Sequence, residues 1–197
     1  MTGLRKLFLL LLLTLLASCA RHDLPQPLHA IDVSWQLTHA GFHLTDANGK
    51  ARTLGDFSNK VVLLFFGYTH CPEVCPTTLA DLAQAMRELG PDAGKVQVLF
   101  VTLDPERDTP QVLGKFVPSF DPSFLGLYGD AQATAQAAKA FQVNYQKHYS
   151  KDGSYTLDHS DGTYLIGIGG KPIWKSRYGQ RTDYLVQDIR RLIAAGS

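Results

Sequence analysis

The sequence predicts a single α/β domain with a parallel sheet at its centre. Residues 61–66 form an apolar run rich in β-branched and aromatic side chains, and residues 96–103 form a second such run. Neither run alternates regularly with polar residues, which is typical of strands buried on both faces. Apolar residues at helical spacing lie between the two runs, over residues 77–89. This strand, helix, strand order favours parallel pairing through a right-handed crossover.

The composition fits one globular domain and argues against some partners. The chain has 197 residues, of which 45% are hydrophobic, and this is enough for a core of ordinary size. The formal net charge is +1, and no basic tract is present. We therefore expect no nucleic-acid partner.

The N-terminal residues are typical of an export signal. Arg5 and Lys6 precede an apolar run over residues 7–16, which is short for a membrane span. The run ends in Leu16-Ala17-Ser18-Cys19, which resembles the processing site of a bacterial lipoprotein. The resemblance implies that residues 1–18 are a signal peptide and that Cys19 is lipidated. It also implies a periplasmic lipoprotein anchored to one of the two membranes. A plain signal peptide or an uncleaved anchor is the alternative.

A tether is expected between this anchor and the folded domain. We assign residues 19–30 to the lipidated cysteine and the tether, and residues 31–197 to the domain. Pro25 and Pro27 favour an extended chain in the tether. Residues 35–37 form a short strand candidate.

A β-hairpin is expected before the central strand. Asn48-Gly49 is a strong signal for a two-residue turn, and it lies between residues 41–45 and residues 50–54. The central strand then leads directly to Cys71 and Cys75. Thr69, Pro72 and Pro76 suit a helix start, since Thr can cap a helix and Pro is tolerated in its first turn.

The second half of the chain predicts two further helices, a hairpin and a terminal unit. Thr109-Pro110 is expected to begin a helix that ends before Pro118, residues 131–141 form an Ala-rich helix, and Asp152-Gly153 is expected to be the turn of an inserted hairpin. The remaining strands and the closing helix are expected over residues 143–149, 155–157, 163–168, 172–177 and 184–194. A terminal antiparallel pair followed by a helix is the layout of a thioredoxin-like sheet. We therefore expect a thioredoxin-like fold with an N-terminal β-hairpin extension and an inserted β-hairpin.

Two of the three cysteines are candidates for chemistry. If Cys19 carries a lipid, Cys71 and Cys75 remain, and a disulfide across three residues would contribute little stability. On a helix, residues four apart project from one face. The pair can therefore clamp a soft ion or oxidise to a disulfide, and thiolates suit Cu(I), Zn and Fe–S clusters. A helix N-terminus would also favour the thiolate form.

One of the seven histidines is the best candidate for a third ligand. His159 directly precedes an expected strand whose leading loop would pass over the helix start that carries the cysteines. His70 adjoins Cys71, but neighbours in sequence often point apart. The other five are expected on the surface or in the tether: His22, His29, His39, His43 and His148.

Three segments, in order along the chain, together resemble the signature of a known protein family. The first is Phe65-Phe66-Gly67-Tyr68-Thr69-His70-Cys71-Pro72-Glu73-Val74-Cys75-Pro76, followed by Leu79. The second is Val101-Thr102-Leu103-Asp104-Pro105-Glu106-Arg107-Asp108-Thr109-Pro110. The third is Asp158-His159-Ser160, followed by Tyr164-Leu165-Ile166. Together these segments resemble the Sco/SenC family, the copper proteins of cytochrome oxidase assembly. The cysteine spacing alone would be a weak signal, whereas three ordered segments are specific.

The resemblance implies a copper site and a partner. Cys71, Cys75 and His159 match the copper ligands of the family, and the family's fold is thioredoxin-like. It further implies copper delivery to, or thiol reduction at, the dinuclear Cu-A site of cytochrome c oxidase subunit II, with a periplasmic copper donor or thiol reductant as a second partner. Two thiolates and an imidazole suit both Cu(I) and Cu(II). The anchor departs from the family, because many members have a transmembrane helix.

The residues around these ligands have open or structural roles. Asp104 and Asp158 are candidates to orient His159 by hydrogen bonding. For the others, a structural interpretation is preferred, as loop, cap or core residues: Tyr68, Arg107, Asp108 and Thr109.

Three functions remain in competition from the residues alone. The first is a copper metallochaperone, and the second is a thiol-disulfide oxidoreductase to which copper binding is incidental. The third is a peroxidase-like thiol enzyme, but no activating Arg or Gln/Trp pair stands out beside Cys71. A thioredoxin motif has two residues between its cysteines rather than three, and a structural zinc site needs four ligands where three are found. Whether the protein passes copper or electrons stays open.

Overall fold

An eight-stranded mixed sheet forms the centre of the protein. The computed structural model describes residues 28–196. Neighbouring strands in the sheet follow the order β1-β10-β9-β4-β5-β6-β2-β3. The strands are β1 Ile31–Asp32, β2 His43–Asp46, β3 Ala51–Thr53, β4 Val61–Gly67, β5 Val96–Thr102, β6 Leu125–Tyr128, β9 Thr163–Ile166 and β10 Ile173–Ser176.

Strand β4 lies at the heart of the sheet, as the sequence predicts. All seven of its residues are buried, and so are all seven of β5. Strand β4 pairs in parallel with β5 and antiparallel with β9. Strand β9 in turn pairs antiparallel with β10. This is the expected thioredoxin-like arrangement. The parallel pair places the end of β4 beside the end of β5, so the two loops that follow them meet at one edge of the sheet.

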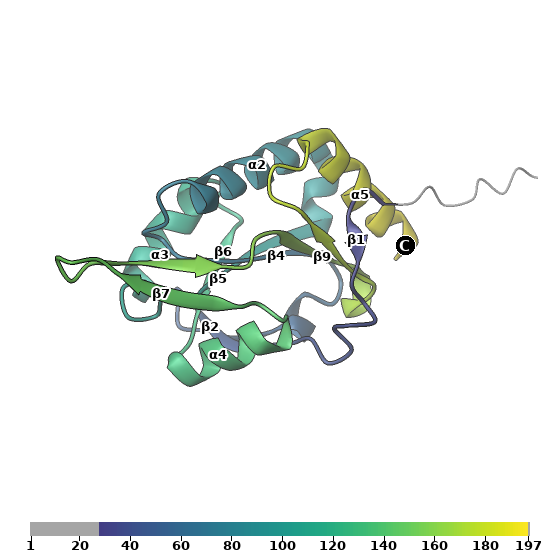
Figure 1. Cartoon of the computed structure of the whole chain (residues 1–197). Coiled ribbons are helices and arrows are strands. Elements are labelled where there is room, and N and C mark those ends of the chain that lie inside the picture. Colours follow the sequence, from purple (N-terminus) through teal and green to yellow (C-terminus); the bar gives the residue numbers. More distant parts are fainter. Residues whose placement is uncertain (1–27, 197) are drawn as a thin grey trace, which may run out of the picture.

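Helices cover both faces of this sheet. Figure 1 shows α2 and α5 side by side above the sheet and α4 below it. The helices are α2 Val74–Leu89, α3 Pro110–Phe116, α4 Ala131–Ala140 and α5 Thr182–Ala195. Short 3-10 turns lie at Leu54–Phe57, Gly90–Lys95, Val117–Ser119 and Ile168–Gly170. The expected cap is confirmed at Thr109, whose side chain accepts a hydrogen bond from the Val112 amide.

Helix α2 begins after Cys71, so the two cysteines do not lie on one face of a helix as expected. Its N-cap is Glu73, without a side-chain cap, so Cys75 lies in the first turn and Cys71 lies in the loop before it. The expectation that Thr69 caps the helix is therefore wrong. Thr69 donates instead to the carboxylate of Asp108.

The two predicted hairpins have different relations to the sheet. Strands β2 and β3 pair around Asn48-Gly49, and β2 also pairs with β6, so this hairpin extends the main sheet. The inserted hairpin consists of β7 Tyr145–Tyr149 and β8 Tyr155–His159. It forms a separate two-stranded sheet and projects to the left in Figure 1.

The structure differs from the sequence prediction in the short strands. Residues 35–37 do not form a strand: residues 34–36 are a turn, and the amides of Gln36 and Leu37 both donate to the Val33 carbonyl. Strands β1 and β6 were not predicted. Each is short, and each is held by pairing with a strand that is distant in sequence.

The beginning of the described chain is fixed to α5. The amides of His29 and Ala30 donate to the two carboxylate oxygens of Asp188, each at 2.9 Å. The last residues of the predicted tether thus belong to the folded domain. The predicted signal peptide and Cys19 lie outside the described residues. Within residues 28–196, none of the helices has both the length and the apolar character that a membrane crossing requires.

Gly67 offers a test of the packing between β4 and α2. A Cβ at this position would lie 2.8 Å from Cys75 Sγ and 3.0 Å from Phe100 Cε2. We predict that Gly67→Ala lowers the free energy of unfolding by about 1–3 kcal/mol, since overpacking a dense core costs about that much. Gly94→Ala is the matched control, because its Cβ would meet no atom within 4 Å. Urea unfolding of both variants measures the difference, and equal stability would contradict the prediction.

Candidate metal and thiol site

The structure brings the two cysteines and His159 together at the end of β4. Cys75 Sγ lies 3.7 Å from His159 Nε2, across 84 residues of sequence. The Cys75 amide lies 3.4 Å from Cys71 Sγ and donates to it. The three side chains come from the loop after β4, the first turn of α2 and the last residue of β8. The sequence-predicted candidates therefore form one cluster.

The two thiols have different environments. Both are free, but Cys75 is fully buried whereas Cys71 is partly exposed. Burial raises the pKa of the Cys75 thiol strongly, since an apolar surrounding disfavours the charged thiolate, and a hydrogen bond from the Tyr68 backbone only partly opposes this. The expectation of a thiolate favoured by the helix N-terminus is therefore wrong for Cys75 in the metal-free protein.

His159 is oriented by a backbone carbonyl. Its Nδ1 lies 2.9 Å from the Ser160 oxygen, and a carbonyl only accepts, so the proton of the neutral ring belongs on Nδ1. The lone pair of Nε2 then faces Cys75. The rings of Tyr68 and Phe65 pack edge-on against the imidazole at 6.1 Å and 6.4 Å between centroids. This tautomer leaves Nε2 available to a metal ion.

A cavity of about 420 Å³ opens over this cluster. Cys71 and His159 line it, and its walls come from the loop before α2 and from β8. Two sulfurs and one imidazole nitrogen are donors that suit a soft ion. In the part of the chain that the structure describes, however, no three His, Cys, Asp or Glu side chains are already arranged to hold a metal ion.

Asp108 holds the loop that carries Cys71. Its buried carboxylate accepts hydrogen bonds from the Thr69 amide at 3.0 Å, the Thr69 hydroxyl at 2.5 Å and the Thr102 hydroxyl at 2.6 Å. His70 is half exposed, and its Nδ1 lies 3.9 Å from Asp108 and 3.2 Å from the Thr69 hydroxyl. The His70 ring is thus held at the Asp108 side of the loop.

Neither of the aspartates expected to orient His159 makes a hydrogen bond to it among the described residues. Asp158 is exposed and lies 3.0 Å from His148 on the neighbouring strand. Its direction follows from the strand, since successive side chains of β8 point to opposite faces. The buried Asp104 accepts from Arg107 and from the hydroxyl of Tyr155. Within the described residues, Asp104 and Asp158 therefore bind other partners and do not orient His159 by hydrogen bonds, contrary to the expectation.

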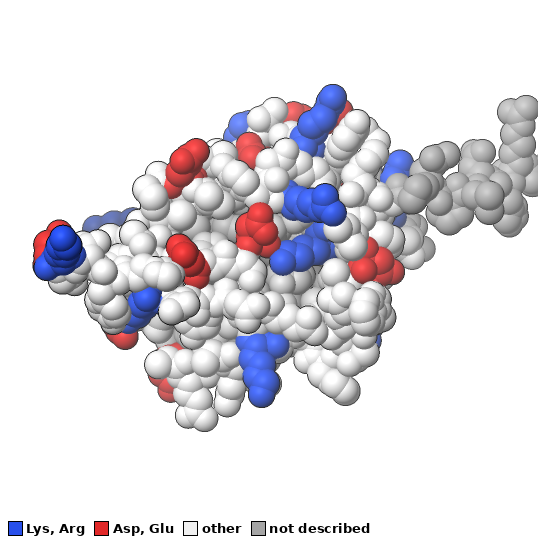
Figure 2. Space-filling view, in the orientation of Figure 1, with Lys and Arg blue, Asp and Glu red and all other residues white. Residues whose placement is uncertain are grey.

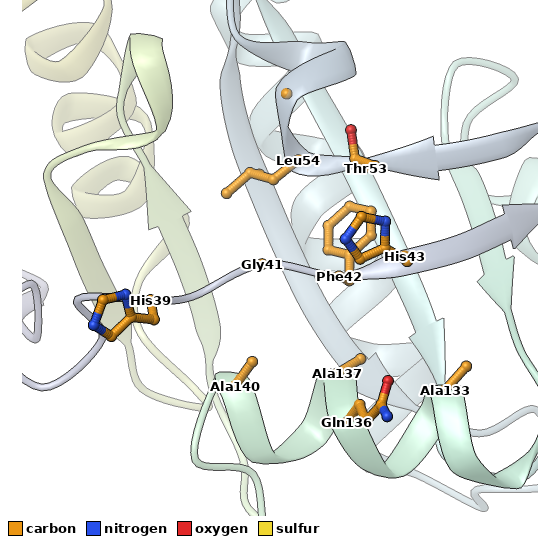
Figure 3. A pocket seen from close by; sticks show the side chains of 11 residues that line it. His39, Gly41, Phe42, His43, Thr53, Leu54, Ala133, Gln136, Ala137 and Ala140 are labelled. Atoms are coloured by element: carbon orange, nitrogen blue, oxygen red, sulfur yellow. The ribbon is translucent and has the colours of Figure 1, made fainter.

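A second cavity of about 420 Å³ lies elsewhere, between α4 and the strand β2. Figure 3 shows His39 and His43 at its wall, separated by Gly41, and small side chains of α4 opposite them. Its lining has no cysteine. Figure 2 shows acidic and basic side chains interspersed on the face in view, without a large area of one sign. The cysteine cluster thus remains the best candidate for chemistry.

Comparison with known proteins agrees with this fold. The SCO1/SenC family model matches residues 34–194. "Protein SCO2 homolog, mitochondrial" from Homo sapiens is 38% identical over 159 residues, which are 78% of this chain and 59% of that protein. The chain thus spans about three fifths of the length of this curated relative.

Two solved structures are similar over nearly their whole length. The structure of Bradyrhizobium japonicum ScoI with copper bound is 39% identical, with a TM-score of 0.72, over 83% of this chain and 99% of that one. The solution structure of apo Sco1 from Thermus thermophilus is 40% identical, with a TM-score of 0.71, over 84% and 94%. With the family model matched across all three motifs, the chain belongs to the SCO1/SenC family.

Proposed function

We propose that this protein binds copper through Cys71, Cys75 and His159 and serves the maturation of the Cu-A site of cytochrome c oxidase. The observation that carries the proposal is the approach of His159 Nε2 to Cys75 Sγ, with Cys71 beside them at the mouth of a cavity. A relative of 39% identity has been solved with copper bound, which supports the choice of metal. Subunit II of the oxidase is the proposed partner, and a periplasmic copper donor or thiol reductant is the proposed supplier.

The donor set explains why one site can take both copper oxidation states. The two sulfurs favour Cu(I), and the imidazole nitrogen also suits Cu(II). Binding to sulfur requires deprotonation, so copper loading releases the proton of Cys75 that burial otherwise retains. The more exposed Cys71 is the thiol that a partner reaches first.

The same two thiols support the alternative function of a periplasmic thiol-disulfide oxidoreductase. In that reaction the Cys71 sulfur attacks a disulfide of the partner and Cys75 then displaces the partner's sulfur. A Cys71–Cys75 disulfide forms, two electrons and two protons pass to the partner, and its disulfide becomes two thiols. The observation that favours this reaction is that both cysteines are free and adjacent.

Copper titration of the reduced protein separates these functions. We predict that one Cu(I) binds per chain and that oxidation yields a thiolate-to-Cu(II) charge-transfer band, which His159→Ala removes. His148→Ala is the matched control, because His148 lies on the same hairpin but is half exposed and pairs with Asp158. A wild-type protein that binds no copper yet exchanges its disulfide with a periplasmic reductant would establish the oxidoreductase instead.

The role in oxidase maturation is tested in cells. We predict that deletion of the protein lowers Cu-A oxidase activity under copper limitation and that added copper partly restores it. Cys71→Ser should fail to complement the deletion, whereas His148→Ala should complement it. Oxidase activity measured in membranes gives the readout, and unchanged activity after deletion would count against the role.

We further propose that Cys19 is lipidated and that the domain is held at a periplasmic membrane surface. The support is the short apolar run followed by Leu16-Ala17-Ser18-Cys19. We predict that Cys19→Ala abolishes incorporation of a labelled fatty acid and moves the protein from the membrane to the soluble fraction. Cys71→Ser should keep both properties. Equal membrane retention of Cys19→Ala and wild type would refute the lipid anchor.

A further inference from the structure

His159 is carried by an element that does not belong to the main sheet. It is the last residue of β8, and β8 pairs only with β7. Cys71, in contrast, lies in the loop after β4, and Cys75 lies in the first turn of α2. Strand β4 and helix α2 are both packed in the core. The distance between the imidazole and the thiols therefore depends on how the hairpin is held against the body of the protein.

Arg107 makes several of the contacts that hold the hairpin. Its Nη1 donates to the Tyr155 carbonyl at 2.9 Å, at the start of β8. Its guanidinium also lies over the Tyr155 ring, 3.7 Å from the centroid, and 5.8 Å from the centroid of Tyr68. Tyr68 in turn packs edge-on against His159. Arg107 thus reaches the His159 hairpin by a hydrogen bond and a cation–π contact.

Asp104 closes this set of contacts. Its carboxylate is fully buried and accepts from Arg107 Nε and, at 2.7 Å, from the Tyr155 hydroxyl. The side chain of Tyr155 is therefore bound by an ion pair whose carboxylate is buried and whose guanidinium is partly exposed. The Arg107 Nη2 atom is buried without a hydrogen-bond partner. The position of the guanidinium is therefore set by Asp104, by the Tyr155 carbonyl and by the two tyrosine rings.

The segment after β5 therefore contacts both the loop that carries Cys71 and the hairpin that carries His159. Asp108 binds Thr69 in the cysteine loop, and Arg107, its neighbour, binds Tyr155 in the hairpin. Other contacts also attach the hairpin, because Leu157 is buried in the core and Lys147 pairs with the exposed Glu106. Arg107 differs from these, since it joins the hairpin backbone, a buried carboxylate and the aromatic wall of the site.

We propose that Arg107 is a positioning residue: together with Asp104 and Tyr155 it latches the hairpin so that His159 faces Cys75. The proposal rests on the proposed copper site and adds the residue that preorganises it. Groups that orient metal ligands from outside the coordination shell change metal affinity by about 10–100-fold when they are removed. The latch predicts an effect of this size that acts through His159 alone.

A double-mutant cycle tests this proposal. We predict that Arg107→Leu weakens copper binding about 10-fold or more in the wild-type background and alters the charge-transfer band. In the His159→Ala background the same change should have little further effect, because the ligand that it positions is absent. An equal loss in both backgrounds would show a general structural role and overturn the proposal.

A second measurement uses the metal-free protein. We predict that Arg107→Leu speeds amide hydrogen exchange in residues 155–159 while exchange in α2 stays unchanged. Arg107→Lys should lie between wild type and Arg107→Leu, because it keeps the charge but loses the planar fork. Tyr155→Phe, which removes only the hydroxyl, serves if Arg107→Leu does not fold. Unchanged exchange in the hairpin of these variants would overturn the latch.

Arg181→Leu is the matched control for both experiments. Arg181 also pairs with a carboxylate, Asp183, and lies over a tyrosine ring, Tyr184, but both partners belong to α5. It should leave copper affinity and hairpin exchange unchanged, and an effect as large as that of Arg107→Leu would count against the latch. If the wild-type protein binds no copper, the proposed function fails, whereas the exchange measurement still decides whether Arg107 holds the hairpin.

Discussion

The site depends on the hydrogen bonds that the buried carboxylate of Asp108 accepts. This carboxylate accepts hydrogen bonds from Thr69, just after β4, and from Thr102, the last residue of β5. It thus fixes the chain where the two central parallel strands leave the sheet. The turn from Tyr68 to Cys71 follows at once, closed by a backbone hydrogen bond of 3.3 Å. A buried carboxylate without these donors would be costly, so the cysteine loop and the segment after β5 must form together.

The sequence predicts the centre of the fold better than its edges. Strands β4 and β5 are recognisable because burial on both faces leaves an uninterrupted apolar run. Strand β6, only four residues long, has no such signal, and its pairing with β5 and β2 decides its structure. Residues 35–37 include strand-forming side chains, but hydrogen bonds to the Val33 carbonyl close a turn there. Short segments follow their tertiary partners rather than their own propensity.

The identity of the clustered residues could be predicted from the sequence, but their environments could not. The order of the elements brings His159 to the cysteines, whereas the burial of Cys75 depends on how closely Gly67 of β4 and His159 of β8 pack against its sulfur. The helix N-terminus is a local feature that favours a thiolate, and burial outweighs it here. Likewise Asp158 adjoins His159 in sequence, yet the alternation of β8 sends it toward His148 on β7.

Under the proposed function, the division of the three candidate ligands between two structural units has a consequence for binding and releasing an ion. The thiols lie at the junction of β4 and α2, whereas the imidazole lies on a hairpin outside the main sheet. A modest displacement of the hairpin would move the imidazole away from the thiols without unfolding the core. Under the proposed function, the contacts between the segment after β5 and Tyr155 then set the balance between retention and release. Tight contacts keep all three candidate ligands in place. Weakened contacts leave only the two thiols to compete with a partner protein for the copper ion.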